Sequence, residues 1–183
     1  MSTDLNTLFA LGVAVGDKLA ARGETIAVAE SSAGGLLSAA LLARAGASAY
    51  YFGGAVLYTR RSRRLLTTLT SDDTVGMRSS SPPYAKLLAA HQRTRFKATW
   101  GLAETGAAGP SGNTYGDPAG HTCLAVDGPV QRYHLPGLHA MNLVIAGALD
   151  GGGPISQRLD PLGKGMAQML LELPITVPAD WAG

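Results

Sequence analysis

The chain has 183 residues, of which 46% are apolar and 15% are charged. This length suffices for one domain with a sizeable core, and the apolar fraction is too high for a disordered chain. Its single cysteine, Cys123, excludes an internal disulfide, and the N-terminus lacks the basic region of a signal peptide, so a secreted, disulfide-rich protein is not expected. The longest apolar stretches fall well short of the roughly 20 residues that a membrane span needs, so we expect a cytoplasmic protein with no membrane partner.

The net charge of +2 is unevenly distributed along the chain. Residues 1–40 carry −2, residues 41–100 carry +8 from ten basic and two acidic side chains, and residues 101–183 carry −4. A basic middle third favours an anionic partner, such as a phosphorylated small molecule. Nucleic acid is not expected, because the basic run is short and the neighbouring Tyr50 and Tyr51 are assigned to the core rather than to a stacking platform.

Apolar periodicity and end signals predict alternating helices and strands. The predicted helices are 4–21, 36–44, 60–69, about 82–95, 138–149 and 161–173. The predicted strands are 25–29, 50–58, 98–104, 121–126 and 130–135, the last two joined by a hairpin turn at 127–129. Segments 70–81 and 105–119 are predicted loops, and a loosely held tail follows from 174. This pattern is typical of an α/β sandwich with a mixed sheet.

The first candidate site is the turn 30–35, which follows a strand and opens a helix. A serine there would present its hydroxyl at the edge of the sheet, close to amides that could stabilise an oxyanion or bind a phosphate. The amides of Gly34 and Gly35 are the candidates for that oxyanion hole. The alternative is that Ser31 or Ser32 only caps the helix.

The second candidate site is the glycine-rich loop 105–113, in which successive amides could form an anion-binding nest. It matches neither a Walker A loop nor a dinucleotide fingerprint. An ordinary surface loop is the alternative.

The arginines at 60, 63 and 64 share one face of the predicted third helix. They form either a phosphate or carboxylate clamp or a solvated face. The four histidines, His91, His121, His134 and His139, show no ligand spacing with Cys123 or the carboxylates, so no metal site is expected.

Four stretches together resemble the C-terminal domain of the CinA (competence/damage-inducible) family. They are AESSAGGL at 29–36, GASAY at 46–50 running into GGAVLYT at 53–59, TGAAGP at 105–110 and DPAG at 117–120. They occur in the family's order over roughly residues 5–150. The resemblance implies a single-domain three-layer α/β/α sandwich with a mixed sheet over residues 1–150, leaving 151–183 as a C-terminal helix and extended tail.

The resemblance also implies hydrolysis of the carboxamide of nicotinamide mononucleotide, or of a related phosphorylated amide, by a serine nucleophile without metal or cofactor. The family's serine falls on Ser31. The substrate-binding residues expected around it are Ser32, Gly34, Gly35, Arg63, Thr105, Gly106, Gly109 and Pro110. A homo-oligomer is expected because symmetric assemblies are common among soluble proteins.

The family's base is missing from this chain. Its motif places a lysine where the stretch YTRRSR at 58–63 has Arg63. An arginine stays protonated and cannot take the serine proton, so another base is required; Glu30, Glu104 and Tyr58 are the candidates. The alternative function is a protein that binds a nucleotide or other anion without catalysis, with Arg63 as a clamp.

Overall fold

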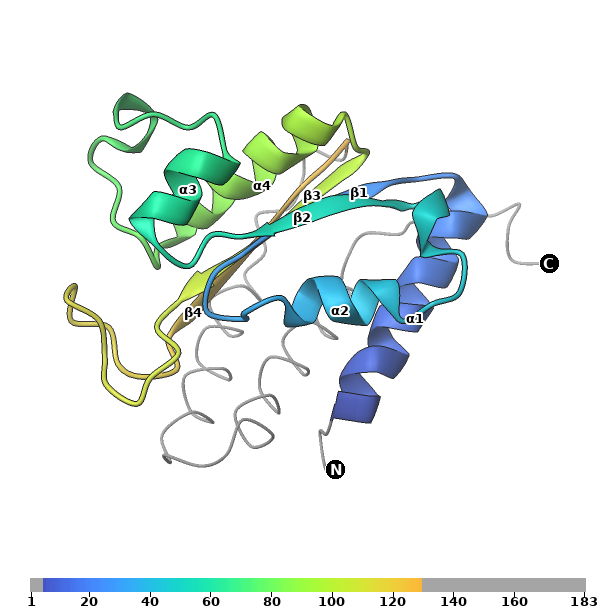
Figure 1. The fold of residues 1–183 in the computed structure, drawn as a ribbon, viewed down its shortest axis with the longest axis horizontal. Coiled ribbons are helices and arrows are strands. Elements are labelled where there is room, and N and C mark those ends of the chain that lie inside the picture. The colour runs from blue at the N-terminus through green and yellow to red at the C-terminus, as the bar shows by residue number, and fades with distance from the viewer. Residues whose placement is uncertain (1–4, 130–183) are drawn as a thin grey trace.

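The computed structural model of this chain describes residues 5–129, with side chains from residue 8 onward. Helices and strands alternate along this part of the chain (Figure 1). The helices are α1 (Leu5–Arg22), α2 (Leu36–Leu42), α3 (Arg60–Leu66) and α4 (Pro82–Phe96), with short 3-10 turns η1 (Ala47–Ala49) and η2 (Asp72–Thr74); the strands are β1 (Ile26–Glu30), β2 (Tyr51–Val56), β3 (Trp100–Gly106) and β4 (Thr122–Asp127).

The four strands form one mixed sheet in the order β2-β1-β3-β4. The central strand β1 pairs in parallel with β2 and β3, whereas β4 runs antiparallel to β3. The carboxyl ends of three parallel strands therefore meet at one edge. In open α/β sheets this edge is where ligands bind.

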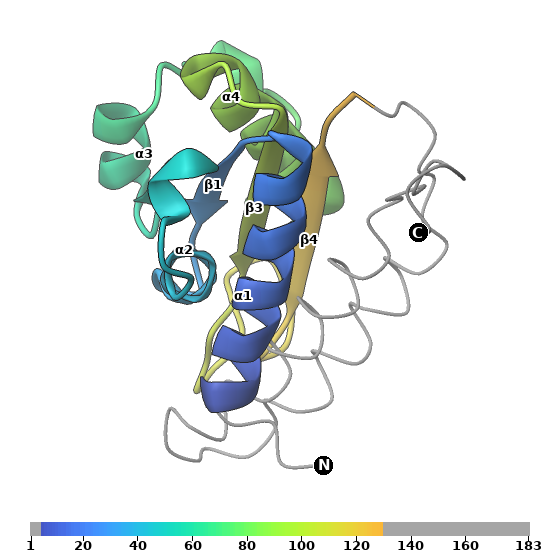
Figure 2. The same ribbon diagram turned by 90° about the vertical axis from the view of Figure 1, so that its right-hand side faces the viewer.

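Helices cover both faces of the sheet (Figures 1 and 2). Along β1 and β3 the side chains alternate between two cores: Val28 and Leu102 pack in the core shared with α1 and α2, while Ala29 and Ala103 pack in the core beneath α4. The structure thus confirms the three-layer α/β/α sandwich with a mixed sheet. No helix in residues 5–129 has the length and hydrophobicity required to cross a lipid bilayer.

Every helix and strand predicted within residues 5–129 is present, with differences at their ends, and the 3-10 turns η1 and η2 were not predicted. Helix α3 stops at Leu66 rather than 69, because Thr67 adopts an extended conformation with φ −126°. The expected loop 70–81 contains η2. Tyr50 is fully buried in the core as predicted, and Tyr51 packs against it. The predicted strand 130–135, the helices 138–149 and 161–173 and the tail lie outside the described residues.

Candidate functional site

A cavity of about 450 Å³ opens at the carboxyl edge of the three parallel strands. Ser31 enters it from the turn after β1, residues 57–60 from the segment after β2, and Thr105 and Gly106 from the end of β3. Helix α3, the loop between α3 and α4, and Tyr115 complete the walls. The volume is in the range of small-molecule sites. Ser31 of the first predicted candidate site and Thr105 and Gly106 of the second therefore line one hollow.

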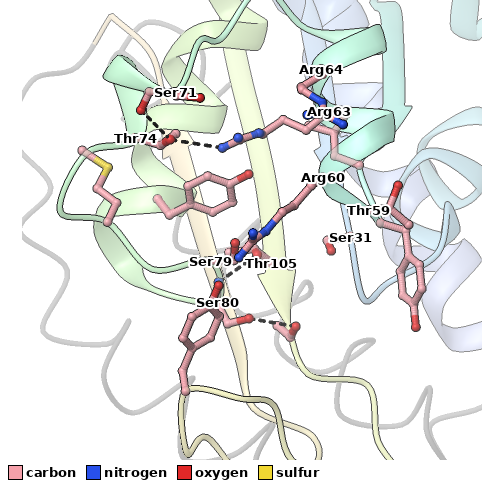
Figure 3. A pocket seen from close by; sticks show the side chains of 16 residues that line it. Ser31, Thr59, Arg60, Arg63, Arg64, Ser71, Thr74, Ser79, Ser80 and Thr105 are labelled. Atoms are coloured by element: carbon pink, nitrogen blue, oxygen red, sulfur yellow. Dashed lines mark hydrogen bonds between the residues drawn. The ribbon is translucent and has the colours of Figure 1, made fainter.

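The two adjacent serines after β1 have different surroundings. The hydroxyl of Ser32 donates to the carboxylate of Glu104, which also accepts the N–H groups of Ser31 at 2.9 Å and Ala33 at 2.8 Å. Ser31 lines the cavity, and its hydroxyl makes no hydrogen bond within residues 5–129. Ser31 is therefore the serine whose hydroxyl is available to a ligand (Figure 3).

The carboxylate of Glu30 holds the start of α2. It accepts the N–H groups of Gly35, Leu37 and Ser38 at 2.9–3.0 Å, as well as the Ser38 hydroxyl. Glu30 is almost fully buried and lies outside the cavity lining. Gly35 occupies the N-cap position without a side-chain bond, so the alternative that Ser31 or Ser32 only caps this helix is wrong.

The amides expected to form an oxyanion hole are engaged inside the turn. The N–H of Gly34 donates to the carbonyl of Ser31 at 3.1 Å, and that of Gly35 donates to Glu30. Neither glycine, nor Ser32, lines the cavity. The structure does not bring these three predicted binding residues to the hollow.

Glu104 is completely buried on β3. Burial raises the pKa of its carboxyl group, and the nearby Glu30 raises it further, while the hydrogen bonds from Ser32, Ala33 and Ser31 act in the opposite direction. Its oxygens accept from the turn and it does not line the cavity. Glu104 therefore positions Ser31 by holding the backbone of the turn, without contacting the cavity.

Three guanidinium groups give the cavity its charge. Arg60, Arg63 and Arg64 all line it, and none of the lining residues within 5–129 is an aspartate or a glutamate. Arg63 Nη1 donates to Thr74 Oγ1 at 3.3 Å, while its buried Nε has no acceptor among the described residues. Uncompensated positive charge in a hollow attracts an anion.

The glycine-rich loop meets the cavity only at its beginning. Thr105 and Gly106 line the hollow, whereas Gly109 and Pro110 lie outside the lining. Next to Gly106, the N–H of Ala107 donates to the His121 carbonyl at 2.7 Å. A Cβ at Gly106 would collide with that carbonyl and with the Ser32 hydroxyl, so this glycine is required for close packing.

The segment 71–80 and Tyr115 were missed as site residues from the sequence. Ser71, Thr74, Ser79 and Ser80 line the cavity, and the only signal for them was a loop rich in hydroxyl groups. Hydrogen bonds with Ser79 and Arg60, together with the Arg60 charge, lower the pKa of the Tyr115 hydroxyl.

Two further polar contacts hold the loop that carries Tyr115. Asn113 Oδ1 accepts the Tyr115 N–H at 3.0 Å, and the carboxylate of Asp117 pairs with Arg78 at 3.0 Å. Tyr58, the predicted catalytic tyrosine, also lines the cavity and is 68% exposed.

No cluster of three or more His, Cys, Asp or Glu side chains suited to a metal ion occurs in the described part of the chain. His121 lies beside the cavity wall, where its Nε2 is 2.8 Å from the Ser80 carbonyl oxygen. His134 and His139 fall outside the described residues.

Comparison with known proteins gives consistent matches. The model of the CinA C-terminal domain family matches residues 9–141, and the model of the AtuA ferredoxin-like domain matches residues 118–176, most of which lie outside the described residues. A CinA-like protein of Anaeromyxobacter sp. (strain Fw109-5) is 39% identical over 112 residues, 61% of this chain. The alignments span 27% or less of the length of the curated relatives.

Solved structures share the fold. The competence/damage inducible protein CihA from Agrobacterium tumefaciens is 25% identical with a TM-score of 0.67, over 90% of this chain and 94% of that one. A CinA superfamily protein from Escherichia coli has a TM-score of 0.68 at 23% identity, over 90% of both chains, which shows a common fold.

Proposed function

The chain belongs to the CinA C-terminal domain family, and from this premise we propose that it is an amidohydrolase acting on nicotinamide mononucleotide or a related phosphorylated amide. Ser31 is the nucleophile. The observation that supports this most directly is the Ser31 hydroxyl, open to a cavity that three arginines line and to which residues 5–129 contribute no carboxylate. A phosphorylated substrate would place its anionic end against those arginines and its amide against Ser31.

In the proposed reaction the Ser31 oxygen attacks the carboxamide carbon and its proton passes to a base. The carbon–nitrogen bond then breaks as the departing nitrogen takes up that proton, releasing ammonia. Water hydrolyses the resulting ester, which yields the carboxylate and restores the serine.

The base in this proposal is a tyrosine. Among the described residues, the titratable groups in the cavity lining are the arginines and three tyrosines, Tyr58, Tyr84 and Tyr115. Tyr58 keeps the catalytic role expected from the sequence. Tyr115 is the second candidate, because the neighbouring Ser79 and Arg60 lower the pKa of its hydroxyl. Glu30 and Glu104 act as positioning residues, since their oxygens are bound by the turn.

The test is ammonia release from nicotinamide mononucleotide by the purified chain. Ser31→Ala is expected to lower the rate by about 1000-fold or more, as removal of a nucleophile does. Ser32→Ala is the matched control, since it removes the neighbouring hydroxyl that faces Glu104; it is expected to keep most of the activity. Equal activity of Ser31→Ala and the wild type would refute the proposal.

A second candidate function is ligand binding without catalysis. It is favoured by Arg63, which holds the family's lysine position and donates to Thr74 instead of accepting a proton. This candidate predicts a ligand-induced rise in melting temperature with no ammonia release. Under the amidohydrolase proposal Arg63→Lys raises the rate, because a lysine can be deprotonated at a site of this kind.

A further inference from the structure

The cavity holds two guanidinium groups that are anchored on different walls. Arg60 and Arg63 are one turn apart on α3, yet Figure 3 shows their side chains diverging, with Arg63 reaching toward Thr74 and Ser71 and Arg60 toward Ser79. Arg63 Nη1 donates to Thr74 at 3.3 Å, and Arg60 is hydrogen-bonded to Tyr115. The hollow therefore presents two separate cationic positions.

No acidic side chain in the described part of the chain neutralises either position. The lining contributed by residues 5–129 contains no aspartate or glutamate, and neither arginine forms an ion pair within that range. The Nε of Arg63 is buried without an acceptor in that part of the chain, and a buried donor left unpaired carries a free-energy cost. An oxyanion that draws the guanidinium group toward itself would relieve that cost.

The surroundings of both arginines suit phosphoryl oxygens. Ser71 and Thr74 line the wall that Arg63 faces, and Ser79 lies on the wall that Arg60 faces. Guanidinium forks and hydroxyl groups are the donors that bind phosphate most specifically in proteins. A single phosphoryl group would fill one of the two positions and leave the other cation unpaired.

We propose that the cavity binds a ligand with two linked phosphoryl groups, a diphosphate ester such as a nicotinamide dinucleotide, with one phosphoryl group at Arg60 and the other at Arg63. This inference deepens the proposed function by naming the substrate class of the same site. It rests on that function for the orientation of the ligand, whose amide end lies at Ser31.

The test is isothermal titration of the full chain carrying Ser31→Ala with four ligands: inorganic phosphate, pyrophosphate, nicotinamide mononucleotide and nicotinamide adenine dinucleotide. We expect each diphosphate ligand to bind at least about tenfold more tightly than its monophosphate counterpart, a difference of about 1.4 kcal/mol. Arg63→Gln is expected to reduce this preference to about threefold or less.

Arg61→Gln is the matched control. It removes the same charge from the same helix, but Arg61 is exposed and does not line the cavity, so the diphosphate preference should persist. The inference is overturned if no ligand binds, if the preference is absent, if it survives Arg63→Gln, or if Arg61→Gln reduces it equally. Melting temperatures of both variants establish that they are folded.

The two proposals fail in different ways. A chain that prefers diphosphates through Arg63, but releases no ammonia from either nucleotide, refutes the amidohydrolase proposal and supports the binding inference. A chain whose ammonia release depends on Ser31, but which binds mono- and diphosphates equally, does the reverse.

Discussion

At the scale of single residues, two buried glutamates fix the turn that presents Ser31. Glu30 binds amides at the start of α2 and Glu104 binds amides at the start of the turn, so the backbone on both sides of the serine is held. From the sequence alone, both carboxylates were candidates for the catalytic base. Their oxygens instead take up donors that would otherwise be buried without partners.

Glu104→Gln is predicted to keep the fold and to change how stability depends on pH. The glutamine oxygen can accept the N–H groups of Ser31 and Ala33, while its NH₂ group donates to the Ser32 hydroxyl. The raised pKa of Glu104 means that the folded state binds its proton more tightly than the unfolded state does. The contribution of this group therefore falls as pH rises from the ordinary glutamate pKa of about 4.3 to the raised folded value.

Glutamine has no such titration, so the variant should gain stability relative to the wild type as pH rises from about 4 through neutrality. Urea unfolding at several pH values measures the difference. A constant difference across that range would contradict the prediction.

Glu30→Gln provides the contrast, because each oxygen of Glu30 accepts hydrogen bonds from two donor groups. An NH₂ group there would face an N–H, and the variant should lose about 1–3 kcal/mol.

At the scale of elements, α3 depends on its cap. The helix has no buried residue, and Thr59 forms a capping box with Ser62 in which Thr59 Oγ1 accepts the Ser62 N–H at 3.0 Å. This seven-residue helix carries Arg60, Arg63 and Arg64 into the cavity. A helix this short has little stability of its own.

Thr59→Ala is therefore predicted to loosen α3 locally by about 1 kcal/mol. A free-energy difference of about 1.4 kcal/mol corresponds to a tenfold change in an equilibrium constant. Amide hydrogen exchange in α3 should therefore accelerate by about fivefold, while the melting temperature changes little. Thr68→Ala, at an exposed position just after the helix, serves as the control. Exchange rates that rise equally in the two variants would argue against a capping role.

At the scale of the whole molecule, α1 and α2 form one layer over the sheet and approach each other closely. A Cβ at Gly12 would collide with the backbone carbonyl of Ala40, and one at Gly16 would collide with the Tyr50 ring. This layer thus requires glycine at the two places where α1 approaches α2 and Tyr50.

Gly12→Ala is predicted to lower the free energy of unfolding by about 1–3 kcal/mol, because overpacking against backbone outweighs the roughly 1 kcal/mol gain in helix propensity. Denaturant unfolding measures the change. Ala14→Met adds more volume on the exposed side of the same helix and should change stability by no more than about 0.5 kcal/mol. A Gly12→Ala chain as stable as the wild type would show that the helices separate without cost.

The order of elements was predictable across the described residues because each carries a local signal. Pro82 and Pro83 open α4 where prolines are tolerated, and the short β-prone run before Ser31 predicted β1. The family motifs also predicted that Ser31, Arg63 and Thr105 would belong to one site. The exact end of α3 was not predictable, because Thr67 leaves the helix where its neighbours alone would have allowed another turn.

Which polar group does which task was decided by the tertiary structure. Ser31 and Ser32 are adjacent and chemically identical, yet Glu104, 72 and 73 residues away along the chain, binds the hydroxyl of one and only the amide of the other. The direction of Arg63 likewise depends on Thr74 across the cavity. Periodicity and turn chemistry act between near neighbours and determined the helices, strands and turns from the sequence by itself; the partners of buried polar groups come from distant segments, and only the packing of the sheet selects them.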